Sequence, residues 1–329
     1  MSIKQFPGGI ITQNPTAPTT ASAKGIWTLD QASNYVKQGI WPRSPGAPTI
    51  GTATATGGTT ATVTYTAPTD LGTGAITYAV TSTPSGGTGS GASPITVSGL
   101  SGGTSYTFTV TASTPGGSGP ASAASNSITT DPVIGGAYGG GYFAGQISTA
   151  GNGIADYNLV VGPVASAQNS SIQYKNANTA TTGADSFING PQNTADMVAG
   201  GSSTVYPAAH FCNDLVIGGF SDWYMPAANE LEVCYFNLKP TTQNNNTSTG
   251  TNTNAVPSRG SDYTVGTPAQ TSSADFKDTG AEDFATAGYW SSTDASTARA
   301  YGRGFASGYR YYKNKSTYYR VRAIRRVAV

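Results

Sequence analysis

The sequence contains little charge, one histidine and two cysteines, and each shortage excludes a class of function. Only 10% of the 329 residues are charged and the net charge is +1, whereas a nucleic-acid-binding protein normally carries a broad basic surplus. His210 alone cannot supply a multi-histidine metal site, so we expect a structural histidine. Cys212 and Cys234 form neither a CxxC metal pair nor a disulfide framework. We therefore expect no nucleic-acid partner, no metal centre and no cofactor.

Long apolar runs are also missing. No run approaches the roughly 20 residues that a membrane-spanning helix requires, so we expect a soluble chain without membrane insertion. The opening MSIKQFPGGIITQNP lacks the apolar core of a signal peptide. If the protein leaves the cell that made it, lysis or a virion is the expected route.

Glycine and small polar residues are abundant. The chain contains 43 glycines and runs of Thr, Ser, Ala and Asn, which is typical of short-stranded β proteins with many turns. A chain of this length normally forms two or three domains. Changes of pattern predict an N-terminal segment at 1–44, a β-sandwich domain at 45–131 and a third domain at 132–329.

The N-terminal segment combines a polar Pro/Thr stretch with one short helix. Leu29, Ala32 and Val36 have helical spacing. Either Thr28 or Asp30 can cap the start of this helix.

Trp27 and Trp41 flank the predicted helix. A segment this short cannot bury two tryptophans by itself, so we expect them to dock on another copy of the chain or on another virion protein. The alternative is that they pack on the next domain. The stretch GIWTLDQASNYVKQGIWP resembles a short segment near the start of many phage structural proteins, which implies a virion anchor. We also expect a homo-oligomer, with a trimer favoured because phage fibres are commonly trimeric.

Residues 45–131 alternate apolar or β-branched positions with polar ones, a pattern typical of strands. The stretch LSGGTSYTFTVTASTPGGSGPAS resembles the fibronectin type III family, in which a tyrosine hydroxyl bonds back to nearby backbone. Tyr106, which follows Leu100, matches that tyrosine. The tryptophan usual on the second strand is absent, and Val63 or Tyr65 stands near its position. The resemblance implies a β sandwich. Because no chemistry is visible in this segment, we expect it to act as a rigid spacer.

The third domain begins with the glycine-rich joint PVIGGAYGGGYFAG, and no helical pattern follows it to support a phosphate loop. The stretch AAHFCNDLVIGG predicts a short helix stopped by Gly218 and Gly219. A second helix follows, with Pro226 in its first turn and an apolar stripe that includes Leu231 and Leu238. For the cysteines on these helices we favour two buried free thiols over a bridge between them. An Asn/Thr-rich loop and several short strands complete the chain.

Four stretches of the third domain, PAAHFCNDL, GGFSDWYMPAANELE, GYWSST and VRAIR, carry a resemblance to a known family. In order and spacing they resemble the Lcl C-terminal domain of collagen-like bacterial adhesins and their phage relatives. The resemblance covers nearly all of residues 135–329 and implies a C-type-lectin-like fold, with Trp223, Tyr289 and Trp290 as aromatic anchors beneath irregular loops. The expected fold class is therefore mainly β in the N-terminal half and α+β in the C-terminal domain.

The segment from Arg299 to Tyr319 has a composition suited to binding. Tyrosine offers a large contact area at low entropy cost, and aromatic rings stack on sugar faces. Because side chains alternate along a strand, roughly half of these tyrosines should face the core instead. The candidate ligand-binding residues are Tyr301, Arg303, Tyr309, Arg310, Tyr311, Tyr312, Asn314 and Tyr318.

Basic residues are concentrated in the same strands, where they could meet anionic glycans or lipopolysaccharide phosphates. For Arg322 and Arg325 we favour pairing with carboxylates inside the domain or between copies, because the resemblance makes VRAIR a framework motif. The basic set is Arg299, Arg303, Arg310, Lys313, Lys315, Arg320, Arg322, Arg325 and Arg326.

The acidic stretch SADFKDTGAEDF is the remaining candidate for catalysis, through Asp275, Asp278, Glu282 and Asp283. Paired carboxylates can cleave glycosides, but the stretch fits a solvated loop more simply. A calcium site is the weaker alternative, because the acids lack EF-hand spacing. We therefore expect a protein without enzymatic activity.

These features together predict a phage virion structural protein located in the virion. The favoured function is a fibre or adhesin that binds a host cell-surface glycan or protein receptor. The alternative is a capsid or tail decoration protein with a structural role and no specific receptor. The expected partners are other virion proteins, through the N-terminal segment, and the host receptor.

Overall fold

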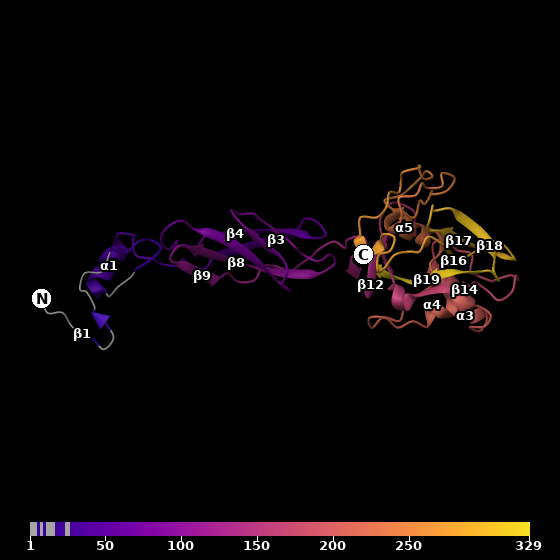
Figure 1. The fold of residues 1–329 in the computed structure, drawn as a ribbon, viewed down its shortest axis with the longest axis horizontal. Helices are drawn as coiled ribbons and strands as arrows, with labels where there is room; N and C mark the ends of the chain where they lie inside the picture. The colour runs from indigo at the N-terminus through magenta and orange to yellow at the C-terminus, as the bar shows by residue number, and fades with distance from the viewer. Residues whose placement is uncertain (1–4, 7–8, 11–16, 24–26) are drawn as a thin grey trace. The chain divides into compact units, whose positions relative to one another are not determined.

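The computed structural model describes residues 5–6, 9–10, 17–23 and 27–329 (Figure 1). Residues 1–4, 7–8, 11–16 and 24–26 of the predicted N-terminal anchor lie outside the described residues. The chain divides into two compact units, residues 1–132 and 133–329. None of the helices in the described ranges is both long enough and apolar enough to cross a membrane.

The N-terminal helix α1 runs from Leu29 to Lys37 and begins at a capping box. Of the two predicted caps, Thr28 is the one used, because its hydroxyl accepts a hydrogen bond from the Gln31 amide at 3.2 Å. The Gln31 side chain returns a bond to the Thr28 amide at 3.0 Å. The apolar side of the helix is left open, and Leu29 is 85% exposed.

The two N-terminal tryptophans pack on each other, which the sequence analysis did not predict. The Trp27 ring makes edge-to-face contacts with Tyr35 and Trp41, at centroid distances of 5.3 and 5.4 Å. All three rings remain only half-buried.

The first unit also contains the predicted β sandwich, built from eight paired strands. Val63, Val80 and Phe108 are buried in its core. The Tyr106 hydroxyl accepts a hydrogen bond from the Ser101 amide at 2.9 Å, which confirms the predicted tyrosine corner. The strands are β3 (Thr49–Ala55), β4 (Thr60–Thr66), β5 (Thr77–Thr83), β6 (Thr88–Ser90), β7 (Ile95–Ser98), β8 (Ser105–Thr114), β9 (Gly117–Ala121) and β10 (Ile128–Thr129), with a separate hairpin of β1 (Gln5–Phe6) and β2 (Gly9–Ile10) before them.

Val63, not Tyr65, fills the core near the position of the missing tryptophan, because Val63 is fully buried. Tyr65 lies half-exposed against Tyr78, with ring centroids 4.5 Å apart.

The second unit contains two five-stranded sheets and four α-helices. One sheet has the order β11-β12-β13-β20, with β15 beside β12, and the other has the order β14-β19-β16-β17-β18. The strands are β11 (Ala137–Tyr138), β12 (Gly141–Ile147), β13 (Tyr157–Val161), β14 (Gln168–Gln173), β15 (Ala255–Val256), β16 (Gly288–Asp294), β17 (Arg299–Gly304), β18 (Arg310–Asn314), β19 (Tyr318–Arg322) and β20 (Ile324–Ala328). The helices are α2 (Val164–Ala167), α3 (Gly190–Gly200), α4 (Pro207–Asn213) and α5 (Ala228–Leu238), with a short 3-10 helix at Ala274–Phe276.

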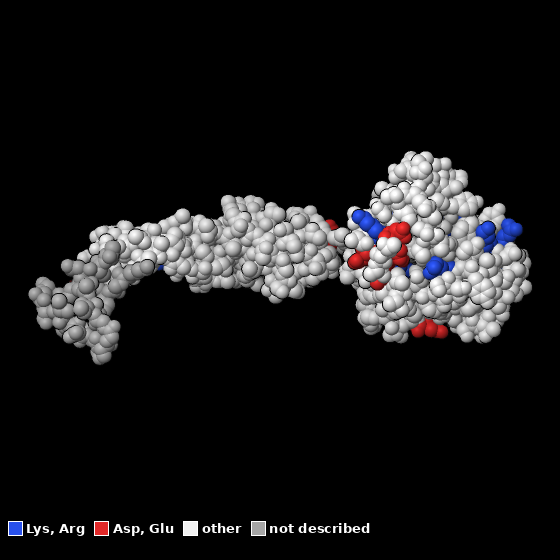
Figure 2. Space-filling model, viewed as in Figure 1, with Lys and Arg blue, Asp and Glu red and all other residues white. Residues whose placement is uncertain are grey.

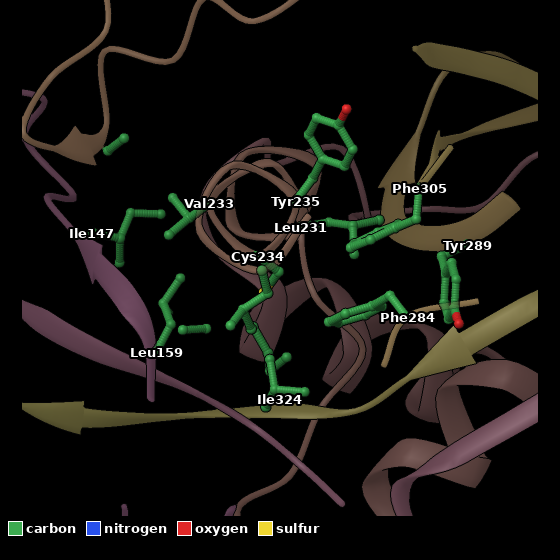
Figure 3. Packing of buried hydrophobic residues seen from close by; sticks show 14 of the residues in the cluster. Ile147, Leu159, Leu231, Val233, Cys234, Tyr235, Phe284, Tyr289, Phe305 and Ile324 are labelled. Carbon is green, nitrogen blue, oxygen red and sulfur yellow. The ribbon is translucent and has the colours of Figure 1, made fainter. Parts of the chain in front are cut away.

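Helix α5 passes through the centre of this unit. Figure 3 shows Leu231 and Cys234 of this helix turned toward Phe284 and Ile324, and Val233 turned toward Ile147 of β12. The predicted apolar stripe of α5 is therefore confirmed as core.

Two predicted helix boundaries are wrong. Helix α4 ends at Asn213, before Gly218 and Gly219, because those glycines instead form a turn that pairs Ile217 with Phe220. Pro226 precedes α5 by two residues instead of lying in its first turn.

Both cysteines are free and buried, which confirms the favoured prediction. Burial raises the pKa of both thiols well above their ordinary value. Trp223, Tyr289 and Trp290 are buried as predicted. The fold class, a β sandwich followed by a mixed α and β domain, is confirmed.

Candidate functional site

Most of the candidate binding residues lie on the hairpin formed by β17 and β18. Its antiparallel register sets Tyr301 opposite Tyr312, Arg303 opposite Arg310, and Arg299 opposite Asn314. Directly opposed residues share one face of a sheet, so these six side chains project from the same side.

Four exposed or half-exposed side chains of this side form a connected cluster with Phe187. The Tyr301 and Tyr312 ring centroids are 6.2 Å apart, and the Arg299 guanidinium lies 5.3 Å from the Tyr312 ring. The Arg310 guanidinium lies 5.5 Å from the Tyr301 ring and 5.8 Å from the Phe187 ring. We name the set Phe187, Arg299, Tyr301, Arg310 and Tyr312 the aromatic–arginine face.

Phe187 was not among the predicted binding residues. It lies in the polar segment before α3, where no periodic pattern marks it as special. Its ring centroid is 5.1 Å from that of Tyr301. The Asn229 amide donates a hydrogen bond to the Phe187 carbonyl at 2.9 Å, which holds the segment against α5.

Two predicted ligand-binding residues, Arg303 and Tyr311, belong to the interior. Arg303 is 3% exposed, and its Nη1 donates to the Gly308 carbonyl at 2.6 Å and to the Tyr263 hydroxyl at 3.1 Å. Tyr311 is 8% exposed and donates to the Tyr289 carbonyl at 3.3 Å. Arg303 projects from the same side of the hairpin as Tyr301, where the segment that carries Tyr263 covers it. Tyr311 pairs with Gly302 and projects from the other side.

The remaining candidates are exposed but do not belong to the cluster. Tyr309 precedes β18, and Asn314 ends it. Tyr318 is 63% exposed and begins β19, which pairs with β14 and β16. Gly308 makes the turn before β18 with φ +73°, a conformation that favours glycine, and a side chain there would collide with Tyr235.

Lys315, predicted among the surface cations, is fully buried. Its ammonium donates to the Thr179 carbonyl, the Thr181 hydroxyl and the Thr297 carbonyl, each at 3.1 Å. It also pairs with the Asp294 carboxylate at 2.8 Å. Lysine ammonium has three protons and is rarely buried without such acceptors. This one cation therefore joins the 179–181 segment to the turn between β16 and β17.

The arginines of the last strands mostly pair inside the unit. Arg322 pairs with Glu282 at 2.7 Å and Arg325 with Asp222 at 2.7 Å, which confirms the internal pairing favoured for both. Arg326 pairs with the buried Glu230 at 2.8 Å. Burial lowers the pKa of Arg322, while Glu282 opposes that shift.

Three cations, Arg299, Arg310 and Lys313, stay exposed on β17 and β18. Figure 2 shows basic atoms at the end of the unit where these strands lie, with no acidic atoms beside them in this view. The exposed surface of the hairpin therefore combines aromatic rings with positive charge.

The groups considered for catalysis have structural contacts. The His210 Nε2 lies 2.8 Å from the Gly201 carbonyl, and Glu282 is engaged by Arg322. Within the described ranges, no group of three His, Cys, Asp or Glu side chains is placed to hold a metal ion.

Comparison with known families identifies two domains. Residues 46–128 match the family model described as the fibronectin type III domain, and residues 176–325 match the one described as the Lcl C-terminal domain. This pair of domains fits a surface or adhesin-like protein. No curated protein matches the sequence.

The similar solved structures include fibronectin type III domains. Domains from titin are 26% identical over 27% of this chain, with a TM-score of 0.24, and the chain spans 32% of that structure's length. The FN5 domain of Drosophila Lar is 22% identical over 27% of this chain and 99% of its own, with a TM-score of 0.22. The fibronectin type-III domain of human fibronectin type III domain containing protein 3 is 27% identical over 29% of this chain and 94% of its own, with a TM-score of 0.23.

Proposed function

We propose that this chain is a phage virion protein, a fibre or adhesin, whose C-terminal unit has a C-type-lectin-like fold and binds a receptor on the host cell surface. The sandwich acts as a spacer, and the receptor is a glycan or a protein. The observation that carries the proposal is the aromatic–arginine face.

The physical basis is the combination of side chains on this face. Tyr312 is 54% exposed, although a large aromatic ring gains by burial. Exposed tyrosines lose little entropy when a partner covers them, and they stack on sugar rings or protein side chains. Arg299 and Arg310 lie over the rings and add charge-assisted hydrogen bonds to anionic groups. The face therefore suits a receptor that carries flat apolar surfaces together with negative charge.

The N-terminal segment supports the virion part of the proposal. Leu29 and Val36 leave α1 as exposed apolar side chains, beside the half-buried Trp27 and Trp41. An exposed apolar set of this kind marks a contact with another protein. We propose that it contacts other virion proteins or copies of this chain, in a homo-oligomer for which a trimer is favoured.

The proposed function is binding without catalysis. It requires no cofactor, no nucleic acid and no membrane insertion, and its place is the virion. Within the acidic stretch, Glu282 already serves the Arg322 ion pair, which supports a structural role for that residue.

The test is binding of the labelled full-length chain to a panel of bacterial strains. The double variant Tyr301→Ala, Tyr312→Ala should bind at least about 30-fold more weakly, since truncating hot-spot aromatics costs about 2 kcal/mol or more. Val216→Ala and Lys277→Ala change exposed positions outside the face and serve as controls.

Circular dichroism checks that each variant is folded. If the folded double variant binds like the wild type, the face is not the receptor site. If the wild type binds no strain, the adhesin proposal fails, and the decoration role, without a receptor, takes its place.

A further inference from the structure

A concave site lies in the C-terminal unit, outside the aromatic–arginine face. Its volume is about 330 Å³, within the range of small-molecule pockets. One wall comes from α5 and the other from the loop before the 3-10 helix. The lining residues are Phe236, Ser258, Arg259, Gly260, Ser261, Asp262, Tyr263, Thr264 and Thr267.

Arg259 of the pocket lining is held by two contacts. Its guanidinium carbon lies 4.0 Å from the Phe236 ring centroid, and its Nη2 donates to the Glu232 carboxylate. Glu232 is fully buried. Its carboxylate also accepts hydrogen bonds from the Tyr263 hydroxyl and from the side-chain amide of Asn252, each at 2.6 Å. A side chain held on two sides keeps its position before a ligand arrives, which lowers the entropy cost of binding.

The rim of the pocket is rich in hydroxyl groups. Ser258, Ser261 and Thr267 are exposed, and each hydroxyl can both donate and accept a hydrogen bond. Asp262 adds an acceptor, although one of its carboxylate oxygens already accepts from the Thr251 amide and hydroxyl.

The charges around the pocket balance. Among the lining residues, Arg259 carries one positive charge and Asp262 one negative charge, so the net charge of the lining is zero. A wall without excess charge does not select an ion, whereas a mixture of donors, acceptors and aromatic surface suits a neutral ligand with many hydroxyl groups.

We propose that this pocket binds one neutral sugar ring, separately from the receptor face. The Arg259 guanidinium and the Asp262 carboxylate orient the ring through its hydroxyl groups, and the serines and threonines of the lining complete its hydrogen bonds. The proposal does not depend on the aromatic–arginine face, since the two sites share no lining residue.

The chain offers a matched pair of variants for the test. At both Gly260 and Gly266 an added Cβ meets nothing within 4 Å, and both positions are exposed. Only Gly260 lines the pocket. Gly260→Trp therefore fills the site, and Gly266→Trp places the same side chain outside it.

The experiment is saturation-transfer NMR on the full-length chain, with methyl glucoside, methyl galactoside and N-acetylglucosamine as probes. At least one of these should bind with a Kd of about 1 mM or weaker, as expected for so few ligand atoms. Gly260→Trp should abolish the signal, while Gly266→Trp and the double variant Tyr301→Ala, Tyr312→Ala should retain it.

Four results would overturn the proposal. The signal could persist in Gly260→Trp, or it could be missing for every probe with the wild type. Sodium acetate could bind in place of the sugars, which would make the ligand an anion. Finally, the signal could be lost in the double variant Tyr301→Ala, Tyr312→Ala but not in Gly260→Trp, which would assign the sugar to the receptor face.

Discussion

Replacing Lys315 by methionine tests whether its buried ammonium holds the C-terminal unit together. Methionine keeps the length and apolar stem of the side chain but leaves the Asp294 carboxylate and three other acceptors without their donor. Removing one partner of a buried ion pair costs about 3–5 kcal/mol. For a unit of this size each kcal/mol lowers the melting temperature by roughly 2–4 °C, so we expect a decrease of about 6–20 °C.

Scanning calorimetry of the full-length chain measures this decrease in melting temperature. Two further variants test whether the decrease comes from the buried ion pair. Lys313→Met removes an exposed cation two residues away and should change stability by less than about 0.5 kcal/mol. The double variant Lys315→Met, Asp294→Leu removes both charges and should recover part of the loss, because no unpaired carboxylate remains. If Lys315→Met melts within about 3 °C of the wild type, the ammonium does not carry the stability assigned to it here.

Three further predictions concern other parts of the chain. Tyr106→Phe should lower the urea midpoint, at a cost of about 1–3 kcal/mol, because the Ser101 amide loses its acceptor; an unchanged midpoint would contradict the role of the corner. Cys212 and Cys234 should not react with a thiol reagent in the folded protein and should react after unfolding, because burial hides them and raises the pKa of both thiols. Hydrogen bonds from the Thr149 hydroxyl and amide lower the pKa of Asp156 below its ordinary value of 3.8. The stability that this carboxylate contributes is therefore present above pH 3.8 and is lost as the pH falls through the lowered pKa. An NMR titration that finds Asp156 at or above 3.8 would refute this.

Local patterns were sufficient for much of the fold. The alternation around Tyr106 and the spacing of Leu231 and Leu238 are short-range signals, and both elements formed as predicted. Helix ends were less predictable. Gly218 and Gly219 do not end the helix. Helix α4 already ends at Asn213, and the two glycines lie in a separate turn between Ile217 and Phe220.

The candidate site could be predicted only in part, because alternation along a strand is a local signal. Alternation along β18 correctly separates Tyr312 from the buried Tyr311, but it cannot show which outward-facing residues another segment covers. Arg303 faces the side of Tyr301 and is buried by a loop 40 residues earlier in the chain. Lys315 is embedded by a segment 136 residues away, and nothing in the sequence around it differs from an ordinary exposed turn.

The buried ammonium of Lys315 also affects how the order of the surrounding segments depends on dissolved ions. Many irregular loops are ordered by a dissolved divalent ion, whose occupancy falls when the ion is scarce. Lys315 is a cation supplied by the chain itself, so dilution cannot remove it and a chelator cannot compete for it. The segments that it joins should keep their order in fresh water, in serum or in a chelating buffer alike. That part of the surface of the C-terminal unit would then not depend on the ionic composition of the medium.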